Sequence, residues 1–564
     1  MSGPTVSQAL GWQPARLGDL AQEWEATAGR LQSHADAVEH AMQTTWWSGA
    51  GADAARRGLA PTAAGLRELC RALVLAAAEA RDAQQALTTA REQVVADLAE
   101  ARADGCSVSD DGAVAPPASP SELLVACSGG SPTAAMTMLT VRADHLTRRL
   151  RQSLTRLGAA DAEAARAIDA AFDVAPGPAA VRPAGAAGAA VGDWPTMSQD
   201  RIAGQIATLS AAERERLVEH APHEVGNTDG VPWEMRVAAN RINIATAILD
   251  ERRTLDRPVE DKLRSAISPG MNPADAERLW AVLHTDPTMR DAVIAGHDRA
   301  ANRRIAYYER LLADVPDPLD RDRRIPRQIL AFDPDREMFI ELSGDLGRAR
   351  AIGVLVPGLN TTFGDTADDL ATTRRFVAGS GGDVAMINYL GGPFPTGPLP
   401  AGIVDAAEPD YALAMAPRLV AFSEDVERRA GDIPVTYIGH SYGGSIVGTA
   451  ERFGLTADRV IYVEAAGAGV GVHSPADWHN RNPAVLRFSM TAPGDLISAV
   501  QGIPFGPHGA DPDEMPGVIP LATGRRLTGE PMVGLSTHSD VLTEPSDAWH
   551  NILAVIIGDR EHIR

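Results

Sequence analysis

The sequence predicts a mostly parallel sheet with flanking helices in its C-terminal part, preceded by a large all-α N-terminal region. Two observations predict this. Over much of residues 1–326 the apolar residues recur at spacings of three and four, which is the period of an amphipathic helix. From residue 327 the pattern changes to short β-rich runs, separated by segments long enough to carry crossover helices.

The composition of the 564 residues bounds the class of protein. An apolar fraction of 45% is enough for a core, and the length suggests several domains. The net charge of -22 argues against nucleic acid as a partner. No apolar run reaches the roughly 18 residues of a transmembrane segment. The start, MSGPTVSQAL, lacks the basic n-region of a Sec signal peptide.

Lysine and cysteine usage excludes several kinds of site. Lys262 is the single lysine among 52 basic residues, and it has no Gly-rich loop beside it, so a P-loop nucleotide site is absent. The cysteines Cys70, Cys106 and Cys127 form no C-x-x-C pair, which argues against zinc ribbons and thioredoxin-like chemistry. Cys106 and Cys127 either pair as a disulfide or stay as thiols. We expect no metal and no cofactor.

The first 104 residues predict a helical hairpin. Apolar side chains run from Leu17 to Met42 and again from Leu66 to Leu98 in coiled-coil spacing, and Gly49 supplies a helix stop between them. The turn, Trp47-Ser48-Gly49, resembles the W-x-G turn of WXG-type proteins that type VII secretion systems export. The resemblance implies a helical WXG-type partner and export by such a route.

The same hairpin departs from the WXG pattern. The Y-x-x-x-D/E signal that often follows the second helix is absent, because the first tyrosine of the chain is Tyr307. A plain helix bundle and a cytoplasmic location are therefore the alternatives.

The rest of the chain divides by composition. We predict a linker or ordered loop at 105–132, a long helix packing with the hairpin at 133–174, an Ala/Gly/Pro linker at 175–196, a helical region at 197–326 and the catalytic domain at 327–564. Within the helical region, Gly226–Pro232 forms a turn that starts a helix at Pro232.

Seven short runs in the last part read as strands. The first two are four residues apart and predict a hairpin, whereas the later ones predict parallel strands with crossover helices. They lie at 328–333, 337–343, 351–357, 383–390, 434–440, 459–465 and 484–490.

A candidate nucleophile follows the fifth of these strands. The segment Gly439-His440-Ser441-Tyr442-Gly443 is a G-x-S-x-G pattern between a strand and a helix. In such a turn, which is called a nucleophile elbow, the serine is exposed on a strained backbone, and the glycines let neighbouring backbone approach it. The bare pattern is weakly specific, but its position between strand and helix makes Ser441 a candidate nucleophile.

A serine nucleophile needs a base that an acid orients. In the chain order serine, acid, base, the acid is Asp495 in A-P-G-D or, as the alternative, Glu464, which otherwise serves as a hydrogen-bond partner. Of the later histidines, His538 follows a loop and precedes the predicted final helix, so we assign it as the base. His440 is expected to pack beside the elbow. The other candidates are His508, His550 and His562.

The oxyanion hole requires two backbone N–H donors. One is expected from Tyr442, the residue after the nucleophile, and the other from Leu359 or Asn360 in V-P-G-L-N-T-T, where Gly358 permits close approach. Phe394, Phe505 and the loop 391–400 are candidates for an acyl pocket. The Gly- and Pro-rich segment 499–537 is a candidate pocket wall or lid.

Taken together, G-H-S-Y-G-G, V-P-G-L-N-T-T, A-P-G-D and T-H-S-D resemble a family of actinobacterial α/β-hydrolases of unassigned substrate, and so does the upstream stretch GNTDGVPWEMRVAANRINI. The resemblance covers residues 220–550 and implies an α/β-hydrolase fold and serine hydrolysis. We expect an esterase- or lipase-like enzyme acting on a small acyl ester or lipid. The alternatives are an acyltransferase with the same acyl-enzyme, or a secretion-associated interaction protein that uses the fold as a scaffold.

Overall fold

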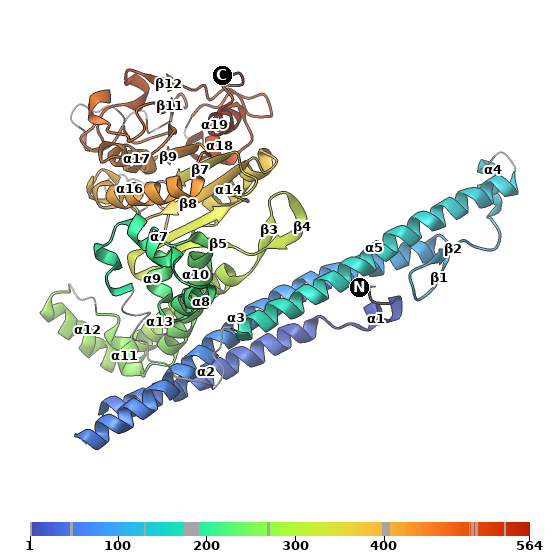
Figure 1. The fold of residues 1–564 in the computed structure, drawn as a ribbon, viewed down its shortest axis with the longest axis horizontal. Helices are drawn as coiled ribbons and strands as arrows, with labels where there is room; N and C mark the ends of the chain where they lie inside the picture. The colour runs from blue at the N-terminus through green and yellow to red at the C-terminus, as the bar shows by residue number, and fades with distance from the viewer. Residues whose placement is uncertain are drawn as a thin grey trace. The chain divides into compact units, whose positions relative to one another are not determined.

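The computed structural model describes residues 3–44, 49–128, 131–173, 191–267, 271–397, 406–495, 497, 501, 506–534 and 537–563 (Figure 1). The chain forms two compact units. One comprises Met1–Arg182 and Ala245–Asp314, and the other comprises Pro183–Ile244 and Val315–Arg564. The predicted helical region 197–326 is thereby shared between the units, and the division falls within α10 (Trp233–Leu255).

Three long helices dominate the first unit. They are α2 (Ala15–Thr44), α3 (Ala50–Ala103) and α5 (Pro132–Asp173), and α3 packs against both of the others. The stripe of Leu87, Val94 and Leu98 on α3 packs with Leu146 and Leu150 on α5 in one buried cluster. Trp47 and Ser48 of the predicted WXG-like turn lie outside the described residues.

Smaller elements complete this unit. The predicted linker 105–132 contains an antiparallel pair of short strands and a helix, so its described part is an ordered segment. Of the two alternatives for Cys106 and Cys127, the structure has Cys106 as a free, buried thiol, and the side chain of Cys127 lies outside the described residues. No helix in the described part of the chain is long and apolar enough to span a membrane.

The other helices and strands of the first unit are α1 (Val6–Gly11), β1 (Ser107–Val108), β2 (Val114–Ala115), α4 (Glu122–Cys127), α11 (Val259–Arg264), α12 (Pro273–Thr285) and α13 (Pro287–Leu312).

The second unit is built on a sheet whose strand order is β12-β11-β10-β9-β7-β8-β6-β5. From β8 to β12 the neighbouring strands are parallel, and β6 pairs antiparallel with both β8 and β5. The predicted fold class is confirmed. The strands are β5 (Gln328–Asp333), β6 (Met338–Ser343), β7 (Ala351–Val356), β8 (Val384–Leu390), β9 (Val435–His440), β10 (Arg459–Val463), β11 (Leu486–Met490) and β12 (Val518–Pro520).

Helices cover the sheet on both faces, since every residue of the central strands β7 and β8 is buried. Phe376 of α14 (Ala367–Gly379) stacks on Trp549 of α19 (Asp547–Ile557), with ring centroids 4.9 Å apart. Both rings belong to a core cluster with Ile438, Ile461 and Phe488. The other covering helices are α16 (Asp410–Ala430), α17 (Tyr442–Arg452) and α18 (Thr537–Thr543), and β3 (Val315–Asp317) with β4 (Asp320–Ile325) forms a separate two-stranded sheet.

The segment upstream of the sheet seals the edge strand β5. The Asn227 side chain accepts from the Phe332 N–H at 2.8 Å and donates to the Phe332 carbonyl at 3.1 Å. Arg236 donates to the Leu330 carbonyl, and Asn240 donates to the Ile329 carbonyl. These side chains therefore take the place of a further strand. They come from α9 (Pro222–Asn227) and α10, which follow α7 (Gln199–Ala207) and α8 (Ala211–His220).

Candidate active site

Ser441 occupies a tight turn between β9 and α17. Its backbone has φ 55° and ψ -121°, a left-handed conformation that L-residues with a side chain rarely adopt. The turn is tied to the next strand, because the Ser441 N–H donates to the Val463 carbonyl at 3.0 Å and the Ser441 carbonyl accepts from the Ala466 N–H. These bonds hold the strained residue at the carboxyl end of the sheet.

Close backbone approach explains the glycines of the pattern. A Cβ on Gly443 would lie 2.1 Å from the Val356 carbonyl oxygen, and one on Gly439 would lie 2.6 Å from the Cα of Gly444. A Cβ on Gly358 would lie 2.6 Å from the Cβ of Ser441. The strand β7 and the loop after it therefore press directly on the elbow.

The structure brings Asp495 and His538 together. The Nδ1–H of His538 donates to Oδ2 of Asp495 at 2.9 Å, and the Ile497 N–H donates to the other carboxylate oxygen at 2.9 Å. Although burial by itself raises the pKa of Asp495, the hydrogen bonds from His538 and Ile497 hold it below its ordinary value. The bond to Nδ1 leaves Nε2 as the basic nitrogen of His538.

His440 lies beside this pair. Its Nε2–H donates to the His538 carbonyl at 2.7 Å, and the two imidazole rings are 5.1 Å apart. Burial and the neighbouring His538 lower the pKa of His440 to about 3, so its ring is neutral at physiological pH. This histidine therefore anchors the backbone of His538.

Glu464, the alternative acid, follows β10 and is fully buried. Its Oε1 accepts from the Ala492 N–H at 2.9 Å, in the loop that leads to Asp495. Burial raises the pKa of Glu464 to about 8. Glu464, Asp495 and His538 offer ligand atoms within 4.8 Å of one another, a grouping that can also hold a metal ion.

The predicted oxyanion donors are Tyr442 and either Leu359 or Asn360. Tyr442 is the first residue of α17, and a helix N-terminus directs its N–H groups toward an anion. Leu359 follows Gly358, which contacts Ser441. The Asn360 N–H instead donates to the Pro395 carbonyl at 2.9 Å, and its side chain accepts from the Gly397 N–H. The Asn360 amide thus closes the loop in this structure, which favours Leu359 as the second donor of the two alternatives.

The remaining histidines are engaged elsewhere. His508 bonds to Ser445 at 2.9 Å through Nδ1 and to the Ala406 carbonyl at 2.7 Å through Nε2. His550 bonds to the Ser546 carbonyl, and His562 bonds to Asp559 near the end of the chain. Sequence order alone did not reveal the link between Ser445 and His508, since the two residues are far apart and share no motif.

The predicted pocket segments are described in part. Phe394 is buried, whereas Phe505 and 398–400 of the loop 391–400 lie outside the described residues. Within 499–537, β12 joins the sheet and both Leu521 and Met532 enter the core, so this part is structural.

Two cavities lie near the elbow. One of about 180 Å³ is largely apolar, and Tyr411 in its wall packs edge-on against Tyr442. Its lining includes Gly392, Pro393, Tyr411, Ala414 and Met415. The other, of about 400 Å³, has a mixed lining, in which polar groups lie beside apolar side chains. Its lining includes Leu355, Leu542, His440, Ser539, Asp368, Asp369 and Arg375. Burial and the adjacent Asp368 raise the pKa of Asp369 to about 7.

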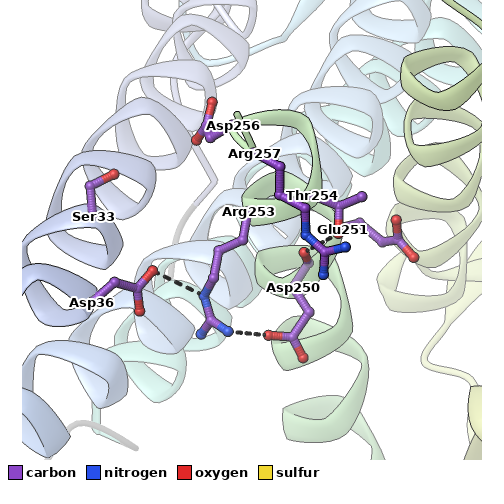
Figure 2. Close-up of a pocket in the computed structure, with 8 residues that line it drawn as sticks. All are labelled: Ser33, Asp36, Asp250, Glu251, Arg253, Thr254, Asp256 and Arg257. Carbon is purple, nitrogen blue, oxygen red and sulfur yellow. Dashed lines mark hydrogen bonds and ion pairs between the residues drawn. The ribbon is translucent and has the colours of Figure 1, made fainter. Parts of the chain in front are cut away.

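The helical unit has a cavity of a different kind (Figure 2). It has a volume of about 670 Å³, and Arg253 in its wall pairs with Asp36 at 3.2 Å and Asp250 at 2.8 Å. Its lining is Ser33, Asp36, Asp250, Glu251, Arg253, Thr254, Asp256 and Arg257. Among the described residues that line this cavity there is no histidine, and two of its carboxylates, Asp36 and Asp250, are paired with Arg253. The candidate active site is therefore the one around Ser441.

Comparisons with known proteins give two relatives, one solved structure and one family match. Two proteins of Mycobacterium tuberculosis, the uncharacterized proteins MT2140 of strain CDC 1551 / Oshkosh and Rv2079 of strain H37Rv, are each 26% identical over 303 residues. The match covers 48% of this chain and 40% of the length of each relative. The crystal structure of TT1662 from Thermus thermophilus aligns with 35% of this chain and 89% of its own at 15% identity, with a TM-score of 0.23. Residues 333–504, which contain Ser441, Glu464 and Asp495, match the family of alpha/beta hydrolases.

Proposed function

We propose that this chain is a serine hydrolase that acts on carboxylic esters, with Ser441 as nucleophile, His538 as base and Asp495 as the acid that orients it. The observation that carries the proposal is the combination of a strained serine at a strand-to-helix turn with a histidine that donates through Nδ1 to a buried carboxylate. Nucleophilic catalysis by serine needs these three roles.

The reaction proceeds in two acyl-transfer steps. Nε2 of His538 takes the Ser441 hydroxyl proton as Oγ attacks the ester carbonyl, and the N–H groups of Tyr442 and Leu359 stabilise the oxyanion. His538 then gives this proton to the departing alkoxide, which leaves an acyl-enzyme. Water attacks the acyl-enzyme with His538 again as base, and collapse of the second oxyanion releases the acid and restores Ser441.

Two cavities close to the elbow are candidates for the two parts of an ester. The cavity beside Tyr411 and Met415 is a candidate for the acyl chain, and the cavity beside His440 is a candidate for the leaving alcohol; Ser441 and His538 line neither of them. An alkoxide also leaves more readily than the amine of an amide, so an ester demands less of the acid that protonates it.

Labelling with a fluorophosphonate tests the nucleophile without knowledge of the substrate. We expect the wild-type chain to label and Ser441→Ala to remain unlabelled. Ser445→Ala is the matched control, because Ser445 lies on the same helix and bonds to His508. Equal labelling of wild type and Ser441→Ala would contradict the proposal.

The ester is then defined by a panel of p-nitrophenyl esters of increasing acyl length. We expect hydrolysis by the wild type and a loss of about 10⁴-fold or more in kcat for His538→Ala. Hydrolysis at full rate by His538→Ala would contradict its role as base.

A further inference from the structure

Glu464 is held in an unusual position. It is the first residue after β10, its φ is 46°, and its side chain is fully buried. Its N–H donates to the Met490 carbonyl at 2.8 Å, at the end of the neighbouring strand β11. A non-glycine residue with positive φ inside a sheet terminus is strained, and such strain is found where a side chain must be aimed.

The Glu464 side chain points to the loop that carries Asp495. Oε1 accepts from the Ala492 N–H, whereas Oε2 is buried and accepts no hydrogen bond from the described residues. The ligand atoms of Glu464, Asp495 and His538 lie within 4.8 Å of one another, so the two carboxyl groups are close enough to affect each other's ionisation. A carboxyl oxygen in that place is satisfied if it carries a proton and donates it.

Two adjacent buried carboxyl groups do not both ionise near neutral pH. Asp495 receives hydrogen bonds from His538 and from the Ile497 N–H, so it is the better site for the negative charge. Glu464 receives one, from Ala492. Burial, together with the charges of Asp495 and Asp513, outweighs the effect of the Ala492 N–H and raises the pKa of Glu464 to about 8.

We propose that Glu464 is a positioning residue whose protonated carboxyl donates a hydrogen bond to Asp495 and thereby fixes that carboxylate against His538. This inference rests on the proposed serine hydrolase function. It adds the neutral carboxyl group of Glu464 to the catalytic set of Ser441, His538 and Asp495. The titratable groups that face Glu464 are Asp495 in the loop after β11, Asp513 before β12 and His538 of α18.

Two substitutions in the full-length chain separate donation from charge. Glu464→Gln keeps a neutral donor and an acceptor for the Ala492 N–H, whereas Glu464→Leu keeps neither. We expect the fluorophosphonate labelling rate of Glu464→Gln to stay within about threefold of wild type, and that of Glu464→Leu to fall by roughly tenfold or more. The wild-type rate should decline above about pH 8 as Glu464 ionises, and Glu464→Gln should show no such decline.

Urea unfolding gives a readout that does not need activity. The folded state keeps the Glu464 proton up to a pKa of about 8, whereas the unfolded state loses it near the ordinary value of about 4.3. Wild-type stability contributed by this group therefore falls as pH rises through that window, and glutamine has no proton to lose. The unfolding midpoint of Glu464→Gln should exceed that of wild type by a margin that grows from pH 5 to pH 8.

Each contrary result has a distinct meaning. Glu464→Leu labelling at the wild-type rate would overturn the positioning role, and Glu464→Gln labelling as slowly as Glu464→Leu would show that a carboxylate is required. Loss of labelling on chelation with recovery on adding Zn²⁺ would make the three residues metal ligands instead. If wild type fails to label, the hydrolase proposal fails and the positioning role with it, whereas the unfolding comparison still decides whether Glu464 is protonated.

Discussion

Single residues around the elbow tolerate little change, because backbone atoms surround them. Val356 and Pro357 press on Gly443, and the Ser441 side chain presses on Gly358. Core sites packed this closely respond to one added methyl group. The glycines of the G-x-S-x-G pattern are therefore required because the surrounding backbone leaves no room for a Cβ atom.

Gly443→Ala tests this requirement. Its Cβ would meet the carbonyl oxygens of Val356 and Pro357 at 2.1 and 2.3 Å, so the elbow must shift. We expect a loss of about 3 kcal/mol in unfolding free energy, measured by urea denaturation, together with loss of fluorophosphonate labelling. Gly364→Ala is the control, because a Cβ there has nothing within 4 Å, and it should change stability by less than about 0.5 kcal/mol.

His440 predicts a pH dependence of stability. Its pKa is about 3 in the folded state and about 6.5 when unfolded, so below pH 6.5 the unfolded chain binds a proton that the folded chain does not. Stability contributed by this group is present above pH 6.5 and is lost as pH falls toward 3. His440→Gln, which keeps a donor for the His538 carbonyl, should lose less unfolding free energy than wild type between pH 7 and pH 5. Equal losses would contradict the buried neutral imidazole.

The residues of the site were predictable to different degrees. Asp495 and His538 carry signals in chain order and turn chemistry, and the structure places them in hydrogen-bond contact. The fate of the Asn360 amide depends on Pro395, which no local pattern links to it. Burial and the proximity of Asp495 decide the protonation of Glu464, and both arise only when β10 and β11 are side by side.

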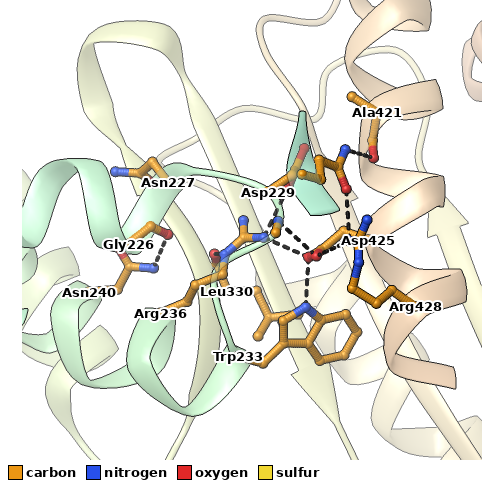
Figure 3. Close-up of polar contacts among 12 residues, drawn as sticks. Gly226, Asn227, Asp229, Trp233, Arg236, Asn240, Leu330, Ala421, Asp425 and Arg428 are labelled. Atoms are coloured by element: carbon orange, nitrogen blue, oxygen red, sulfur yellow. Dashed lines mark hydrogen bonds and ion pairs between the residues drawn. The ribbon is translucent and has the colours of Figure 1, made fainter. Parts of the chain in front are cut away.

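At the scale of elements, the upstream stretch GNTDGVPWEMRVAAN is the partner of β5. Asn227, Arg236 and Asn240 of this stretch contact β5. Asp425 of α16 also accepts hydrogen bonds from the same stretch (Figure 3). It accepts from the Gly230 N–H at 2.9 Å, the Trp233 indole at 2.8 Å and Arg236 at 3.0 Å. An edge strand left bare would invite association with other chains.

Asp425→Ala tests how much this network stabilises the second unit. Arg236 is 1% exposed, so its buried charge would lose one of its partners. The Gly230 N–H and the Trp233 indole N–H would each lose the carboxylate oxygen to which they donate. We expect a loss of about 3–5 kcal/mol in unfolding free energy. The control is Asp383→Ala, which removes the exposed pair with Arg350 and should cost less than about 1 kcal/mol. A small loss for Asp425→Ala would show that water replaces the carboxylate.

Strands that are short, apolar and bounded by turns were predictable, and the seven predicted runs coincide with β5–β11 to within two residues. The strand β12 was missed, because Val518–Pro520 has three residues, ends in proline and is sited at the sheet edge. The pair β3 and β4 was missed because β4, Asp320–Ile325, is largely charged and exposed. In these elements pairing with a neighbour outweighs local propensity.

At the scale of the whole chain, the units do not follow the sequence in order. Residues 245–314 belong with the long N-terminal helices, whereas 183–244 belong with the sheet. Composition could not reveal this, since α10 is one continuous helix with residues in both units. A boundary at 327, drawn where the hydrophobic period changes, separates the sheet from the side chains that complete its edge.

Shortened chains test this assignment. We expect residues 315–564 alone to aggregate or unfold without cooperativity, because Ile329, Leu330 and Phe332 would lose the side chains of Asn240, Arg236 and Asn227. Residues 183–244 joined to 315–564 by a flexible Gly/Ser linker of about 20 residues should run as a monomer in size-exclusion chromatography and unfold cooperatively in urea. The same joined chain with Asn227→Ala, Arg236→Ala and Asn240→Ala is the matched control and should behave like 315–564. Cooperative unfolding of 315–564 by itself would show that the upstream stretch is dispensable for the sheet.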